Sequence, residues 1–335
     1  MSKGGNHMMH EATKKLKRGV KLPVIMAPMF LISNPKMVLA ACEAGIIGTF
    51  PALNARTTEM LDMWLQEITD GIQRIEEGGE EAAPWGINFI SHRSNKRFNE
   101  DLALIEKYEP PLVITSLGDP SPVVQIVKNY GGVVLSDVID MKFAKKALEK
   151  GSDGLVLVAA GAGGHGGRLN PIAFMHEVRE FFDGPIALSG TLSKGEDILV
   201  AETLGADFAY FGTKFIVAEE GSAEDAYREM IVESNISDIT YTPAFSGIHA
   251  NYLTPSIIRA GLDPAQLPEK GKIDFSERGN HDAKAWRDIW GAGQGVGPIK
   301  KVQSVKEITT DLSKEYLAAV EKIANKYNQT MQRSN

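Results

Sequence analysis

The chain has 335 residues, of which 36 are Lys or Arg and 43 are Asp or Glu, giving a formal net charge of −7. This acidic balance disfavours nucleic-acid and anionic-membrane partners, which require a basic face, and no run of about 18 apolar residues occurs to form a membrane span. The single cysteine, Cys42, excludes an internal disulfide or multi-thiolate metal site and indicates a reducing compartment, so a cytoplasmic protein is expected.

Residues 1–19 are polar and unpatterned, which predicts a flexible N-terminal arm. Eight short apolar runs follow, most of them bounded by Gly or Pro, and several are succeeded by a segment with helical periodicity. The runs begin at Val24, Gly45, Gly86, Leu112, Val133, Gly154, Ile186 and Phe208. They lack polar alternation, as expected of strands buried on both faces of a parallel sheet. Eight successive strand–helix units favour a (β/α)8 TIM barrel over a doubly wound sheet, because no reversal of strand order is evident.

The alternation of apolar runs with helical segments stops after the eighth run. Residues 214–234 are expected to form a helix, 235–304 are rich in turns and aromatic residues, and 305–332 have the pattern of one amphipathic helix. We therefore expect a barrel formed by residues 20–235 and 305–335. A smaller inserted cap or substrate domain, residues 236–304, would lie between strand 8 and the last barrel helix. Loops of this length in a compact domain are usually functional.

Barrel active sites lie where the strands end. The residues at these ends are Ala27–Met29, Phe50–Pro51, Asn88, Ser116–Gly118, Asp137, Gly161–Gly167, Ser189–Thr191 and Gly212–Thr213. The last two groups precede helices expected to begin near Ser193 and Lys214. Glycine allows close approach of the backbone, and two helix N-termini would direct N–H groups at one point. A phosphate site formed by Ser189, Gly190, Thr191, Gly212 and Thr213 is therefore predicted.

The glycine cluster at 161–167 matches G-x-G-x-x-G, but no helix opens from its last glycine and the preceding strand is the sixth, so a dinucleotide fingerprint is rejected. The cluster instead presents His165, a lone imidazole at a strand end. Histidine titrates near neutrality and suits both proton abstraction and anion binding. The alternative is a structural loop histidine. No second His or acidic residue stands at ligand spacing nearby, so no metal is expected.

Two other kinds of catalytic site are excluded. A serine hydrolase would need G-x-S-x-G, which is absent. A Schiff-base enzyme would need a lysine at a strand end, and none of the strand-end residues above is a lysine. Cys42 is expected to be a small packed residue. The glycine-rich loop 291–295 could reach back over a ligand with Gln294. Whether the cap aromatics line a cavity or form the cap's own core is left open; they are Tyr241, Phe245, His249 and Tyr252.

Together these motifs resemble the nitronate monooxygenase family, formerly called 2-nitropropane dioxygenases, which also includes flavin-dependent enoyl-ACP reductases. The matching segments, spread from about residue 22 to the end, are VIMAPM at 24–29, GIN at 86–88, GAGGHGG at 161–167, ALSGT at 187–191, LGADFAYFGTKF at 204–215 and GAGQGVG at 291–297. The glycine–histidine loop, combined with the LGAD…GTKF segment, is the specific part of the resemblance.

The resemblance implies a barrel that binds FMN non-covalently, with its phosphate at the predicted phosphate site and His165 as the catalytic residue. The residues implied to contact the ring are Ala27, Pro28, Met29, Asn88, Gly163, Gly164 and Gln294. Asp137 stands where some relatives place a lysine that touches the flavin, and a carboxylate there would disfavour an anionic reduced flavin. This departure bears on the substrate more than on the cofactor.

The leading hypothesis is FMN-dependent oxidation of alkyl nitronates by O2 to a carbonyl compound and nitrite, with His165 deprotonating neutral nitroalkanes where these are used. An NAD(P)H-dependent reductase of the quinone or enoyl-ACP type on the same scaffold is the alternative. A phosphate-ligand sensor or a flavin-free lyase is a third hypothesis. The expected partners are a small-molecule nitronate and O2, and a homodimer is left open.

Overall fold

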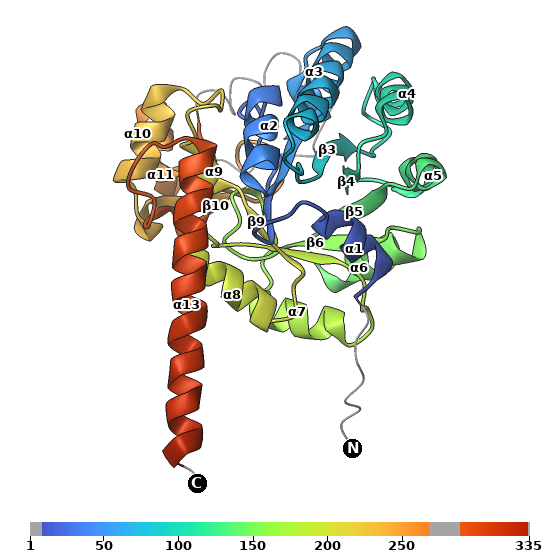
Figure 1. Cartoon of the computed structure of the whole chain (residues 1–335). Helices are drawn as coiled ribbons and strands as arrows, with labels where there is room; N and C mark the ends of the chain where they lie inside the picture. The colour runs from blue at the N-terminus through green and yellow to red at the C-terminus, as the bar shows by residue number, and fades with distance from the viewer. Residues whose placement is uncertain (1–8, 268–288, 334–335) are drawn as a thin grey trace.

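The structure, a computed structural model, describes residues 9–267 and 289–333. All eight expected strands form and close into one parallel barrel, since β1 pairs with both β2 and β9 (Figure 1). The barrel strands are β1 (Val24–Met26), β2 (Ile47–Pro51), β3 (Trp85–Ile90), β4 (Leu112–Ser116), β5 (Val133–Val138), β6 (Gly154–Val158), β8 (Ile186–Ser189) and β9 (Phe208–Phe211). The (β/α)8 barrel expected from the sequence is confirmed.

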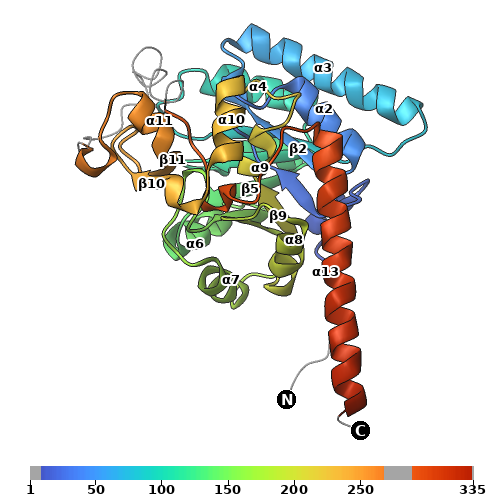
Figure 2. The same ribbon diagram turned by 90° about the vertical axis from the view of Figure 1, so that its left-hand side faces the viewer.

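Helices follow the strands and surround the barrel (Figures 1 and 2). They are α2 (Pro35–Ala44), α3 (Thr58–Glu77), α4 (Phe98–Tyr108), α5 (Ser121–Tyr130), α6 (Met141–Glu149), α7 (Pro171–Arg179) and α8 (Gly195–Thr203). Local signals set their ends. In α2 the Asn34 side chain accepts from the Met37 N–H, proline occupies the first turn, and Gly45 ends the helix at φ 84°.

Residues 11–17 correct the expectation of a flexible arm over 1–19. They form α1 (Glu11–Lys17), in which Leu16 is fully buried and Ala12 nearly so. Both side chains join the apolar cluster of the barrel interior, which includes Val133 at the start of β5. The helix therefore closes the barrel at the N-terminal ends of its strands. A seven-residue, lysine-rich helix carries too little periodicity to be identified from sequence.

The expectation of one helix over 214–234 is also wrong. The chain forms α9 (Thr213–Ile216), then an irregular stretch, then α10 (Asp225–Glu233). Arg228 fixes the stretch by donating to the carbonyl oxygens of Ala218 and Gly221, at 3.2 and 2.7 Å.

The insertion contains a second sheet, antiparallel, in the order β10–β11–β7. Its strand β7 (Gly164–His165) comes from the loop after β6, so the glycine–histidine loop is built into the cap. The other elements here are η2 (Ile236–Asp238), β10 (Ile239–Thr242), β11 (Ala250–Leu253), α11 (Thr254–Arg259), η3 (Pro264–Gln266) and η4 (Gln294–Val296). Residues 268–288 of the expected cap lie outside the described residues.

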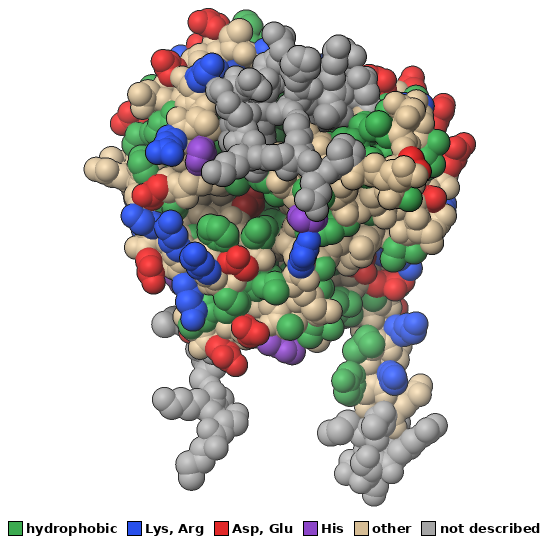
Figure 3. All heavy atoms as spheres, turned by 180° about the vertical axis from the view of Figure 1, so that it is seen from behind, with side chains coloured by type: hydrophobic (Ala, Val, Ile, Leu, Met, Phe, Trp, Pro, Cys, Tyr) green, Lys and Arg blue, Asp and Glu red, His purple; other side chains and the backbone are tan. Residues whose placement is uncertain are grey.

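The last helix, α13 (Val305–Arg333), packs its first turns against α8 and α2 and buries Ile308 and Leu312. It then continues well beyond the barrel, where Figure 3 shows it projecting with hydrophobic and basic side chains on its surface. Among the described helices, none is both long and apolar enough to cross a membrane.

Candidate active site

The barrel interior ends in polar side chains at the carboxyl ends of the strands. Lower inward positions are apolar, such as Ile114 on β4 and Leu135 on β5. Because strand side chains alternate between faces, the next inward positions on these strands are Ser116 and Asp137. Tyr210 on β9 also faces the interior. The sequence placed the chemistry at this end of the barrel, and a polar layer does lie there.

Three of these strand ends are joined by hydrogen bonds. The Asn88 amide donates to the Ile114 carbonyl oxygen at 3.1 Å and to Ser116 Oγ at 2.6 Å. The Ser116 hydroxyl in turn donates to Asp137 Oδ2. Burial raises the pKa of Asp137 to about 6, against the lowering effect of the Ser116 hydrogen bond. Burial, with a smaller contribution from Asp137, also raises the pKa of Tyr210.

The loop after β8 has unusual backbone geometry. Gly190 has φ 127°, and a Cβ there would lie 2.8 Å from the Ala160 carbonyl oxygen. Thr191 also has positive φ, 62°, and its hydroxyl donates to the Gly190 carbonyl at 2.6 Å. Such strained positions persist where the surroundings impose them, and they cluster at ligand sites. Ser189 is buried beneath the loop, and Gly212 with Thr213 opens α9 beside it.

The expectation that the N-terminus of α8 also faces the ligand is wrong. The N–H groups of Ser193 and Lys194 donate to Asp197 Oδ2, at 2.7 and 2.8 Å. The Gly195 N–H donates to Glu315 Oε2 of α13, at 2.7 Å. Because carboxylates already accept from these three N–H groups, the groups are not available to an anion at the mouth.

The glycine-rich loop near residue 293 reaches back onto the mouth. The Gln294 N–H donates to the Gly161 carbonyl at 2.9 Å, and the Gly293 N–H donates to Thr213 Oγ1 at 2.8 Å. The contact leaves no room for side chains, since a Cβ on Gly163 would lie 2.9 Å from the Gly293 nitrogen. The Gln294 side chain itself is exposed.

The turn after β1 is held by a residue that sequence reasoning missed. Ala27 and Met29 are buried and Pro28 is half-buried. The buried Asn54 donates to the carbonyl oxygens of Met29 and Ser33, at 3.0 and 2.8 Å. Its Oδ1 accepts from the N–H of Leu31, which has a positive φ of 65°. A single amide side chain therefore fixes the backbone of this turn.

His165 lies on β7, half-buried, where its backbone pairs with Ala250 of β11. Its Nε2 lies 2.8 Å from Ser246 Oγ, and that hydroxyl donates its single proton to the Ile248 carbonyl oxygen at 3.0 Å. The Ser246 hydroxyl therefore links the His165 ring to the backbone of the cap. No sequence signal identified Ser246.

The cap aromatics form two pairs, and only one of them belongs to the cap's own core. Phe245 and Tyr252 meet edge to face, with ring centroids 4.9 Å apart, and belong to the cap's own core. Tyr241 and His249 stack on each other and instead contact the glycine–histidine loop. Tyr241 donates to the Gly166 carbonyl at 3.1 Å, and Arg168 lies 2.9 Å from His249 Nε2. These contacts hold the segment that carries His165.

Other chemistry is not supported. Cys42 is buried in α2, and burial raises the pKa of its thiol to about 12, so it is a packed residue as expected. Among the residues that the structure describes, no group of three His, Cys, Asp or Glu could hold a metal ion.

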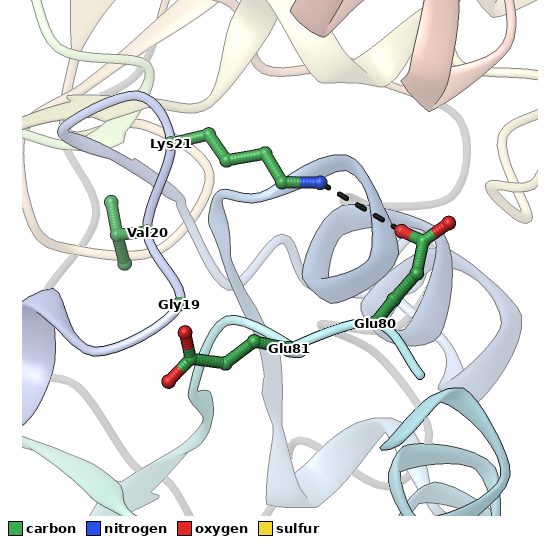
Figure 4. Close-up of a pocket in the computed structure, with 5 residues that line it drawn as sticks. All are labelled: Gly19, Val20, Lys21, Glu80 and Glu81. Carbon is green, nitrogen blue, oxygen red and sulfur yellow. Dashed lines mark ion pairs between the residues drawn. The ribbon is translucent and has the colours of Figure 1, made fainter. Parts of the chain in front are cut away.

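A surface hollow of about 520 Å³ lies at the opposite end of the barrel, where the chain enters β1 and β3 (Figure 4). Lys21 and Glu80 approach to 3.8 Å across it, and both are largely exposed. Because barrel catalysis takes place at the carboxyl ends of the strands, this hollow is not part of the site.

Comparison with known proteins gives a consistent result. A family model described as nitronate monooxygenase matches residues 11–315. A nitronate monooxygenase of Paraburkholderia phytofirmans is 25% identical, covering 91% of this chain and 95% of that protein. A probable nitronate monooxygenase of Bacillus subtilis is 24% identical, covering 92% and 99%. The resemblance inferred from the motifs is confirmed.

Solved structures share the fold. FabK from Thermotoga maritima has a TM-score of 0.77 at 22% identity, covering 95% of this chain and 99% of that one. A nitroalkane oxidase from Streptomyces ansochromogenes has a TM-score of 0.78 at 20% identity, covering 93% and 99%. At these identities the likeness establishes the barrel with its cap and nothing finer.

Proposed function

The chain belongs to the nitronate monooxygenase family, an oxidoreductase family, and from this premise we propose that it binds FMN and oxidises alkyl nitronates with O2 to a carbonyl compound and nitrite. The relatives named as nitronate monooxygenases align over more than nine-tenths of the chain, which supports this substrate class.

The mouth of the barrel suits a flavin mononucleotide. Gly190 is confined by the Ala160 carbonyl, whereas a Cβ on Gly212 would find only Ala27, at 3.7 Å, and one on Gly164 would find nothing within 4 Å. The phosphate would bind at Ser189, Gly190, Thr191, Gly212 and Thr213. The ring would lie among Ala27, Pro28, Met29, Asn88, Asp137, Gly163, Gly164 and Gln294. Bound flavin supplies the electron transfer, and the protein supplies position and polarity.

His165 is the proposed base and anion-binding group, and the observation that carries this role is its hydrogen bond to Ser246. With the ring held by the cap, the His165 imidazole would take the α-proton of a neutral nitroalkane. The resulting imidazolium would stabilise the negative charge of the nitronate. With preformed nitronate, only the second role remains.

The test combines identification of the cofactor with turnover. Flavin released from the purified protein should co-migrate with FMN and not FAD. In air, ethyl nitronate should produce nitrite together with oxygen uptake. If NAD(P)H is oxidised rapidly but ethyl nitronate yields no nitrite, the reductase alternative replaces this proposal.

A further inference from the structure

Asp137 is a half-buried acid in the polar layer, and the mechanism above gives it no chemical role. It is the last inward-facing residue of β5, one position above Leu135 on the same face. Its neighbour on the adjacent strand β4 is Ser116. Tyr210 of β9 also faces the barrel interior, and the charge of Asp137 contributes to the raised pKa of its phenol. The carboxyl group therefore lies beneath whatever occupies the mouth.

Its two oxygens have different surroundings. Oδ2 accepts from the Ser116 hydroxyl, which is positioned by the Asn88 amide. Oδ1 is buried and accepts no hydrogen bond from the residues described. Within residues 9–267 and 289–333, no lysine, arginine or histidine forms an ion pair with Asp137. The two groups that interact with it, Ser116 and Tyr210, are neutral at ordinary pH.

A carboxylate without a cation and with an orphaned oxygen is destabilised, and a ligand covering it removes more water. A negative charge arriving above the carboxylate would favour its protonation, because the neutral acid no longer repels that charge.

We propose that Asp137 is a tuning residue that couples proton uptake to reduction of the bound ring and so sets its reduction potential. The inference rests on the proposed flavin function. When the ring gains two electrons from a reductant such as dithionite or the nitronate, the Asp137 carboxylate takes one proton from solvent. Ser116 and Asn88 position the carboxyl group for this exchange. Charge near the flavin ring is a recognised determinant of its potential.

The test measures the reduction potential of the bound flavin as a function of pH in the holoprotein. Above about pH 6, the equilibrium constant for reduction of the wild-type flavin should decrease by an additional factor of about ten per pH unit. For a two-electron couple this lowers the reduction potential by an additional amount of about 30 mV per pH unit. Asp137→Asn should remove this extra dependence and favour reduction by at least about tenfold at pH 8. Ser116→Ala should move its onset to higher pH, because the ionised acid loses a donor.

Two controls identify the group. Asp119→Asn changes an exposed carboxylate in the loop after β4 and should leave the pH dependence unchanged. His165→Asn should also retain it, which separates Asp137 from the other titratable group of the site. In flavin-free protein, infrared difference spectra of wild type against Asp137→Asn should show one carboxyl group titrating near pH 6.

The outcomes are separable. If Asp137→Asn keeps the wild-type pH dependence while binding flavin and oxidising nitronate, the inference is overturned and the proposed function stands. If the Asp137 carboxyl group of the flavin-free protein titrates at the ordinary aspartate pKa of about 3.9, the inference is overturned as well, because it requires a raised pKa. A wild-type protein that binds no flavin overturns both.

Discussion

His165 Nε2 lies 2.8 Å from Ser246 Oγ, although 81 residues separate the two in the chain. The hydrogen bond joins the loop after β6 to the inserted cap and orients the imidazole ring. The cap therefore holds the side chain that we propose as the base.

Replacing His165 by Ala or Asn should reduce turnover of a neutral nitroalkane by about 10²–10⁴-fold, because the general base is lost. The loss with preformed nitronate should be much smaller, since no proton has to be removed. Steady-state nitrite release with matched nitroalkane and nitronate measures the two. Equal activity of wild type and variant on the neutral substrate would contradict the role.

Ser246→Ala should lower kcat/KM on neutral nitroalkane by about five- to tenfold, the effect of one neutral hydrogen bond of roughly 1 kcal/mol. Its ¹⁵N NMR spectrum should show a changed balance of the two neutral tautomers of His165. Ser237→Ala, an exposed serine of the same insertion, is the control and should change neither. An unaltered tautomer in Ser246→Ala would show that another group orients the ring.

Gly190→Ala should weaken FMN binding by more than about tenfold, since the methyl group meets the Ala160 carbonyl and the positive φ is unfavourable. Gly79→Ala is the matched control: its φ is also positive, 87°, but nothing lies within 4 Å of the added carbon. Fluorescence titration of flavin-free protein gives both affinities. Comparable weakening in the two variants would indicate general destabilisation and not a phosphate site.

Leu16→Ala should lower the free energy of unfolding by about 2–5 kcal/mol, because this fully buried side chain of α1 closes the barrel interior. Lys14→Ala, on the exposed face of the same helix, should change it by less than about 0.5 kcal/mol. Denaturant unfolding followed by circular dichroism measures both. A Leu16→Ala variant as stable as wild type would mean that α1 does not contribute to the core.

The barrel was predictable because each of its signals is local. Buried parallel strands appear as short apolar runs, and caps such as Asn34 before Pro35 mark where helices begin. The positions of Asn88 and Asp137 at strand ends followed directly from this pattern. Their connection through Ser116 did not, because it depends on how neighbouring strands are aligned.

What escaped prediction is long-range. The N-terminus of α8 looked available for an anion, but Glu315, 120 residues away, satisfies its Gly195 N–H. Asn54 appeared to be an ordinary polar residue, yet it makes three hydrogen bonds across the β1 turn. Ser246 is likewise identified only once β7 pairs with β11. Such pairings are set by tertiary packing and leave no periodic trace in one sequence.

The most direct test is the visible spectrum of the purified protein under anaerobic conditions, recorded before and after addition of ethyl nitronate and, separately, NAD(P)H. The account predicts a flavin spectrum that ethyl nitronate reduces, with reoxidation, oxygen consumption and nitrite release when air is admitted. Bleaching by NAD(P)H together with no response to ethyl nitronate would contradict it and would leave His165 as a substrate-binding group of a reductase.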